Sequence, residues 1–192
     1  KRGLEKNSNF ENRSYDICFV CEPSPGWDKI EGDGFEDSLG IIASYALKFS
    51  KDHGKSIHFA GKREKNHPTH ILEIEWYRKY IGDSADEITS NIRENFSTYE
   101  LIDASSVSVG FISTAFIEGM SRGNRCLQCN FTDDEKWDFP FEGPWFLNNN
   151  DYLSFEKSMT YLLSITDEKF IDDAGEMIDY MMNNNESESA ID

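Results

Sequence analysis

Short apolar runs and segments of helical periodicity alternate along most of this 192-residue chain. The apolar runs, which are bounded by Gly, Pro and polar residues, predict β-strands. These strands are expected at 15–22, 56–61, near Ile88, 106–113, 124–131 and 145–147. Apolar residues spaced by three and four predict helices. These are expected at 35–54, 71–81, 97–104, 114–123 and over two segments between 155 and 181.

This alternation predicts a doubly wound, Rossmann-like α/β domain. Strands that alternate with helices form a parallel sheet that helices cover on both faces. We expect the domain to span 15–182, between a polar lead-in at 1–14 and an acidic tail at 183–192. In such sheets ligands bind outside the carboxyl ends of the strands. Functional residues are therefore expected in the loops that follow the strands.

Composition and charge narrow the classes of function. The formal net charge of −17 argues against nucleic acid as a partner, because binding a phosphate backbone needs a broad basic face. The apolar runs are shorter than the ~20 residues that a membrane span requires, and the polar N-terminal segment is unlike a signal peptide. We expect a cytoplasmic location, with peripheral attachment at the inner membrane as an alternative. Because the chain begins with Lys, we expect a processed product or a piece of a longer protein.

The four cysteines form two C-x-x-C pairs, Cys18 with Cys21 and Cys126 with Cys129, which suggest a zinc site as one interpretation. Both pairs fall in predicted strands, where residues three apart point to opposite faces. One zinc ion would not readily collect all four. We therefore interpret the cysteines as buried thiols of a reduced protein, with zinc and a disulfide as the alternatives.

The loop after the second predicted strand, GKREKNHPTH, gathers positive and titratable side chains in an acidic protein. Lys62, Arg63 and Lys65 precede His67, and Pro68 favours an extended backbone at that histidine. Lysine and histidine can both pair with phosphate oxygens. Charge alone favours the alternative interpretation, a solvated run of charges with an incidental histidine.

A second candidate lies where the predicted strand 106–113 gives way to a helix. Ser113 and Thr114 can cap this helix, but its N-terminus also offers free N–H groups and partial positive charge to an anion. Glu118 follows one turn later and can face either a ligand hydroxyl or the helix start. Both candidate loops belong to one sheet edge, and together they suit a nucleotide phosphate. The glycine-rich stretch 22–34 contains no GxGxxG motif, so a dinucleotide site is poorly supported.

These residues resemble a known family. The sequence KNHP at 65–68 resembles the KxHP-type motif of bacterial glycosyltransferases of the GT-B fold. Such motifs occur in sialyltransferases, in Kdo transferases of capsule assembly and in glycerophosphotransferases of teichoic acid synthesis. The segment 101–123, with its Ser-Thr pair and acidic helix, is similar to the next motif of these enzymes in order and separation. The closing helices are similar to those of surface carbohydrate biosynthesis proteins, so that the resemblance covers about 15–182.

The resemblance implies the C-terminal half of a GT-B enzyme, which holds a nucleotide-sugar donor of the CMP or CDP class. It implies that His67 is catalytic, because it would contact the donor phosphate and stabilise the departing group. The substrate-binding residues that it implies are Lys65, Pro68, Ser113, Thr114 and Glu118. No essential metal or cofactor is implied, because protein cations and helix dipoles balance the leaving phosphate in many such enzymes. The implied partners are a glycan acceptor and an N-terminal Rossmann-like domain.

The chain departs from this family because it contains one Rossmann-like domain instead of two. The general base of the related sialyltransferases lies in the other half, and EGDG at 31–34 is too weak a counterpart. We therefore expect sugar transfer to a surface polysaccharide, carried out by this chain or by a larger enzyme of which it is the donor-binding half. A nucleotide-sugar epimerase of the same architecture and a non-catalytic nucleotide-binding module are the alternatives.

Overall fold

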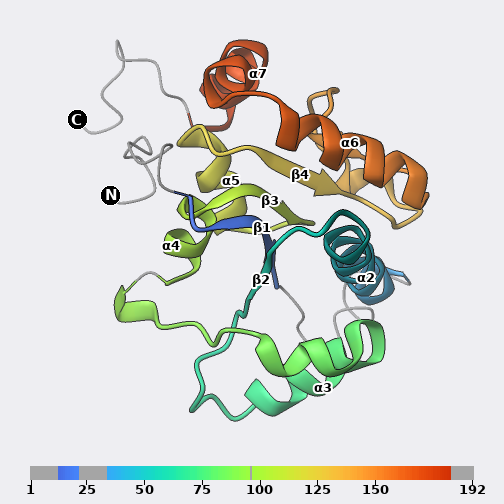
Figure 1. Ribbon diagram of the computed structural model, residues 1–192, viewed down its shortest axis with the longest axis vertical. Coiled ribbons are helices and arrows are strands. Elements are labelled where there is room, and N and C mark those ends of the chain that lie inside the picture. Colours follow the sequence, from blue (N-terminus) through green and yellow to red (C-terminus); the bar gives the residue numbers. More distant parts are fainter. Residues whose placement is uncertain (1–12, 22–33, 96, 183–192) are drawn as a thin grey trace.

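A parallel β-sheet forms the centre of the computed structural model, which describes residues 13–21, 34–95 and 97–182 (Figure 1). The strands are β1 Tyr15–Val20, β2 Ile57–Ala60, β3 Ser105–Gly110, β4 Cys126–Cys129 and β5 Phe146–Leu147. They lie in the order β2-β1-β3-β4-β5, and all neighbours pair in parallel. This sheet, with helices on its faces, confirms the predicted Rossmann-like α/β fold.

Helices connect the strands and cover both faces of the sheet. The α-helices are α2 Phe35–His53, α3 His70–Ile81, α4 Ser97–Asp103, α5 Thr114–Ser121, α6 Tyr152–Ser164 and α7 Asp167–Met182. Short 3-10 helices are η2 Gly82–Glu87, η3 Arg93–Asn95 and η4 Glu135–Trp137. One face carries α2, α3 and α6, and the other carries α4, α5 and α7 (Figure 1).

The strand order reverses between β1 and β3. From β1 the chain passes through α2 to β2 on one side, and from β3 it passes through α5 to β4 on the other. A parallel bridge between Ala60 and Thr89 adds one residue outside β2, so the strand predicted near Ile88 is reduced to this bridge. With the bridge counted as a strand, the order matches the six-stranded Rossmann arrangement 3-2-1-4-5-6.

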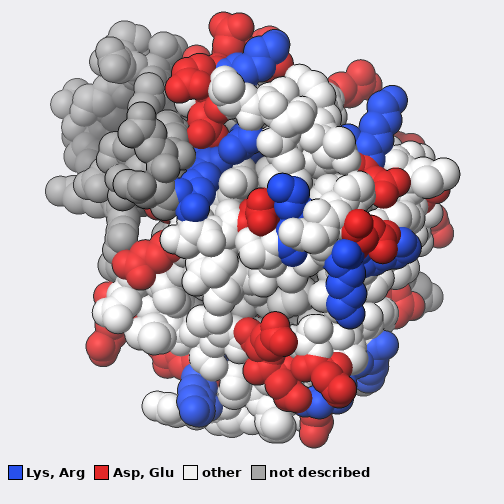
Figure 2. All heavy atoms as spheres, viewed as in Figure 1, with Lys and Arg blue, Asp and Glu red and all other residues white. Residues whose placement is uncertain are grey.

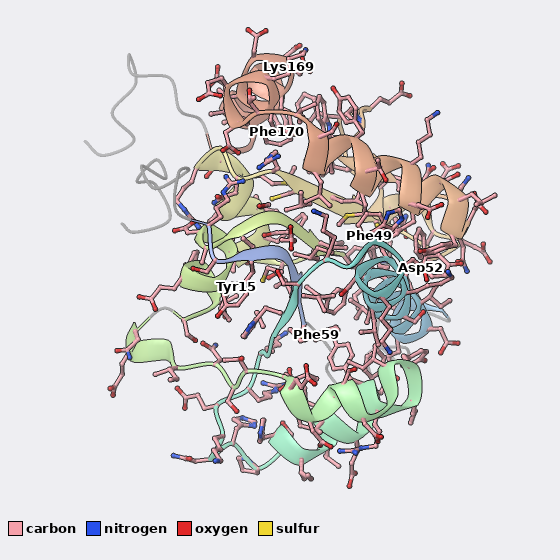
Figure 3. All side chains as sticks on the ribbon, in the orientation of Figure 1. Tyr15, Phe49, Asp52, Phe59, Lys169 and Phe170 are labelled. Carbon is pink, nitrogen blue, oxygen red and sulfur yellow. The ribbon has the colours of Figure 1, made fainter. Side chains whose placement is uncertain are left out.

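Aromatic side chains fill the two layers between the sheet and its helices. Phe19 of β1 meets Tyr77 of α3 edge-on, with ring centroids 5.9 Å apart. On the other face Trp145 meets Phe170 of α7 at 6.0 Å. Figure 3 shows Phe170 directed towards the sheet and Lys169, its neighbour, directed outward. The apolar residues that recur at helical spacing in the sequence therefore lie on the helix faces that pack on the sheet.

Two strands end earlier in the structure than the sequence predicts. β1 ends at Val20 instead of 22, and β3 ends at Gly110 instead of 113. Beyond Gly110, Phe111 and Ile112 turn the chain out of the sheet and into α5. Most of the predicted lead-in and all of the tail lie outside the described residues, as do positions 22–33 of the glycine-rich stretch.

All four cysteines are free and buried. Cys18 and Cys126 pair with Ser108 from its two sides, and Cys129 lies three residues further along β4. Each C-x-x-C pair is therefore divided between the two faces of the sheet, as the strand spacing predicts. Burial raises the pKa of the Cys18 thiol to about 12. These positions describe buried thiols and not a common coordination shell.

A buried group of charges closes the amino edge of the sheet. The carboxylate of Asp167, at the start of α7, lies 2.8 Å from an Arg13 nitrogen and 3.0 Å from Nε of Arg125. The Arg125 guanidinium also donates to the carbonyl oxygens of Leu162 and Ile165, at 2.8 and 2.6 Å. The chain before β1, the start of β4 and the turn between α6 and α7 are thus held together by one carboxylate.

Candidate functional site

The carboxyl edge of the sheet carries the candidate site, at the point where the strand order reverses. The segment that follows β1 enters α2 at Gly34, which is the N-cap residue and has a φ of 94°. The turn after β3 leads at once into α5, and the loop after β4 approaches through η4. In sheets of this type, ligands bind at the strand ends beside such a reversal.

Ser113 stands at the N-cap of α5 in an extended conformation, with φ −152° and ψ 134°. Its side chain makes no capping hydrogen bond, so the alternative interpretation of Ser113 as a capping residue does not hold. Thr114, the first residue of the helix, is exposed, and Ser113 is partly exposed. The first amides of a helix have no partner within it, so this end can offer N–H groups together with two hydroxyls to an anion.

Aromatic rings border the start of α5. Phe111 lies in the turn before α5, and its ring centroid is 5.0 Å from that of Phe35 on α2. Trp137 of η4 lies 5.2 Å from Phe35, and the Lys136 ammonium sits 5.0 Å from its ring centroid. Phe35 and Phe111 are buried and Trp137 is partly exposed. Trp137 therefore packs on the loop and core, and the three rings give this edge an apolar wall.

His67 lies in the basic loop after β2, where its own neighbours fix its ring. Its Nδ1 accepts hydrogen bonds from the backbone N–H of Thr69 at 3.2 Å and from the Thr69 hydroxyl at 2.9 Å. The backbone N–H of His67 donates to Glu64, and that of His70 donates to His67, both at 2.9 Å. Because Nδ1 accepts, the neutral ring carries its proton on Nε2. His67 therefore offers Nε2–H as its hydrogen-bond donor.

The exposed tip of the loop lies beside this histidine. Lys65, Asn66 and Pro68 are exposed, whereas His67 is partly buried. Thr69 is the N-cap of α3, so the loop ends directly at a helix start. Lys65 and His67 are thus neighbours on one short turn that backbone hydrogen bonds hold.

Glu73 was missed by the sequence analysis. This side chain of α3 is 1% exposed, and its carboxylate accepts the backbone N–H groups of Lys62 at 2.7 Å and Arg63 at 3.1 Å. The signal was present in the sequence, because Glu73, Tyr77 and Ile81 share one helical stripe at a spacing of four. A carboxylate on an apolar stripe indicates a buried partner.

The structure places the two candidate loops on either side of β1. His67 bonds within its own loop, while Phe111, beside Ser113, packs against α2 and η4. Figure 1 shows the chain after β2 descending to the lower part of the view, away from α5. Two strand spacings of a sheet amount to about 10 Å. The loops share the carboxyl edge of the sheet, but His67 and Ser113 are not in contact.

Glu118 takes part in a contact between two helices. Its carboxylate accepts a hydrogen bond from the hydroxyl of Tyr99 on α4, and Arg122 lies over the Tyr99 ring at 5.2 Å. Burial raises the pKa of Tyr99 to about 12, and the bond to Glu118 adds to that rise. In this structure, Glu118 therefore joins α5 to α4.

Within the described ranges, no group of three or more His, Cys, Asp or Glu side chains could hold a metal ion. None of the helices in this part of the chain is long and apolar enough to cross a membrane.

Comparisons with known proteins relate almost the whole chain to one family. A family model described as "putative O-antigen biosynthesis protein" matches residues 7–191. A search of curated proteins found no match. The family match is compatible with a role in the biosynthesis of a surface polysaccharide, the same general process that the sequence resemblance implied.

Proposed function

The chain belongs to this O-antigen biosynthesis family, and from that premise we propose that it binds the nucleotide-sugar donor of a glycosyltransferase. The donor is of the CMP or CDP class, and the sugar is transferred to a surface polysaccharide acceptor. The chain supplies the donor-binding domain, and the general base comes from a second Rossmann-like domain. The donor phosphate lies at the carboxyl edge of the sheet, beside β1 and β3.

The observation that carries this proposal is the unused hydroxyl of Ser113 at the start of α5. The oxygen of a capping serine accepts a hydrogen bond from a backbone N–H of the first helical turn. Ser113 makes no such bond, so both its hydroxyl and the first helix amides are available to a ligand. The helix follows β3 directly, at the strand-order reversal where α/β sheets bind phosphates. The apolar wall of Phe35, Phe111 and Trp137 beside it would shield the charge from water.

The chemistry assigned to these residues is stabilisation of a leaving group. In the transfer, the bond between the sugar carbon and the phosphate oxygen breaks, and the acceptor oxygen bonds to that carbon. The phosphate gains negative charge, which N–H and O–H donors stabilise. Ser113, Thr114 and the α5 amides supply donors on one side of β1, and His67 Nε2–H and Lys65 supply them on the other. A donor laid across the end of β1 would meet both.

The test is a binding titration with CDP and CMP, and with cytidine as the phosphate-free control. Ser113→Ala and His67→Ala are each expected to weaken CDP binding about tenfold or more, because a hydrogen bond to a charged group contributes about 1.5–3 kcal/mol. Cytidine binding should change little. Since Ser113 makes no capping bond, Ser113→Ala should not alter the unfolding midpoint.

Matched controls make the same chemical changes elsewhere. Ser158→Ala lies on α6, on the other face of the sheet, and His53→Ala lies at the far end of α2. Both are expected to bind CDP as the unchanged protein does. No CDP or CMP binding at millimolar concentration would refute the donor site. Conversion of a nucleotide sugar in the absence of an acceptor would identify an epimerase. Nucleotide binding without sugar transfer, measured in the presence of the second Rossmann-like domain, would identify a non-catalytic module.

A further inference from the structure

The basic loop is fastened to the protein through a buried carboxylate. Glu73 is 1% exposed, although a carboxylate is costly to remove from water. Burial raises the pKa of Glu73, and the two loop amides and the nearby His70 and Arg63 offset part of that rise. An acid whose pKa rises on folding costs stability once the pH exceeds its unfolded-state pKa. Glu73 is therefore poorly explained as a stabilising core residue.

The Glu73 carboxylate fixes the start of the loop. Its two oxygens accept the N–H groups of Lys62 and Arg63. The carbonyl oxygens of the same two residues accept from Asn91, through its side-chain amide at 3.3 Å and its backbone N–H at 2.9 Å. Lys62 and Arg63 thus have both sides of their backbone bonded, to α3 on one side and to the segment after Thr89 on the other.

The end of the loop is fastened to the same helix. Thr69, the N-cap of α3, donates its N–H and hydroxyl to Nδ1 of His67, and Glu64 accepts the His67 N–H. Between the two attachments lie the exposed Lys65 and Asn66. The first turn of α3 therefore holds both ends of the turn that presents Lys65 and the His67 Nε2–H.

We propose that Glu73 is the positioning residue of this loop: it sets the backbone from which Lys65 and His67 meet a phosphate of the ligand. The inference rests on the proposed donor function and adds to it the residue that holds one half of the site in shape. Preorganised donors stabilise an anion better than mobile ones, because no ordering is needed when the anion binds.

Glu73→Gln tests this with little change in volume. Glutamine has one acceptor oxygen, so its NH₂ group would oppose one of the two loop amides and release the start of the loop. We expect CDP affinity to fall about tenfold. Glu75→Gln is the matched control, since Glu75 is exposed on the same helix and loses the same charge; it should bind CDP normally.

The second readout is the NMR signal of the His67 ring, assigned with His67→Ala and followed while inorganic pyrophosphate or CDP is added. In the unchanged protein both ligands should move this signal. In Glu73→Gln they should move it much less, while the signals of the α5 amides still respond. A role of Glu73 in stability alone would leave the His67 response intact in the folded variant, and that result would overturn the proposal.

The outcomes separate this inference from the proposed function. If CDP moves the α5 amide signals but never that of His67, the donor site stands and the role of Glu73 is refuted. If CDP moves neither set, both are refuted. Should Glu73→Gln fail to fold, Asn91→Ala removes the side-chain hydrogen bond to the Lys62 carbonyl oxygen and so loosens the start of the loop from the other side. Normal CDP affinity and a normal His67 response in that variant would equally refute the proposal.

Discussion

At the scale of single residues, the buried charges hold chain segments that are far apart in the sequence. Asp167 forms ion pairs with both Arg13 and Arg125, and all three side chains are at most 10% exposed. The contacts are close ion pairs with incomplete hydrogen bonding at the shared oxygen. Burial lowers the pKa of Arg125, and the charge of Asp167 opposes that change. Removing one member of such a group leaves a buried charge without compensation.

We therefore expect Asp167→Asn to destabilise the fold by about 3–5 kcal/mol, because two buried guanidinium groups lose the carboxylate that they share. Urea unfolding followed by circular dichroism measures this loss. Asp173→Asn on the same helix is the control, since its partner Lys169 is exposed, and the unfolding midpoint should scarcely move. Equal midpoints for the two variants would show that the buried group contributes little.

Single residues were also the hardest to predict. His67 and Ser113 were found because they follow strands, and a parallel sheet brings strand ends to one edge. Glu73 was not, because it is one of 36 acidic residues and its burial depends on partners distant in the sequence. The tautomer of His67 and the absence of a cap at Ser113 are likewise set by local geometry that the residue types do not specify.

At the scale of elements, the spacing of apolar residues and the Gly, Pro and polar residues that bound each segment were sufficient to predict most helices and strands. Helix α2 begins at Phe35, as predicted, and ends before Gly54, which takes the left-handed conformation. The weak element near Ile88 was misjudged, because one bridge at a sheet edge needs no long apolar run. Packing between elements was beyond prediction: Gly40 of α2 lies under the ring of Tyr80 of α3.

A pair of glycine variants tests this contact. In Gly40→Ala the new methyl group would lie 2.3 Å from the Tyr80 ring, so the ring must move and its hydrogen bond to Asp37 is strained. Overpacking costs about 1–3 kcal/mol, more than the gain of roughly 0.5–1 kcal/mol from an alanine in a helix. Gly175→Ala on α7 meets nothing within 4 Å and receives only the gain. Thermal unfolding should therefore shift down for the first and up for the second; shifts of the same sign would contradict this packing.

At the scale of the whole molecule, acidic surface and buried thiols are the dominant features. Figure 2 shows acidic and basic side chains interspersed over the visible face, with no broad basic area among the described residues there. The four cysteines are buried in the layers between the sheet and its helices. A thiol reagent can therefore reach them only when those layers open.

Thiol labelling should therefore report global unfolding. At pH 8 burial keeps the Cys18 thiol protonated, with a pKa of about 12, and closes all four thiols to reagents. We expect a disulfide reagent to label none of them in the folded protein and all four in urea. Rapid labelling of any cysteine without denaturant would show that a sheet layer opens locally.

The shared carboxylate at the amino edge also sets an order of events during synthesis. Arg13 precedes β1 and Arg125 precedes β4, but their counter-ion belongs to α7, which follows all five strands. A ribosome releases the N-terminal part of a chain first. A sheet assembled from residues up to Leu147 would lack the carboxylate that pairs with both guanidinium groups. Final packing is therefore expected only after the last helix emerges, with Asp167 as the residue that completes it.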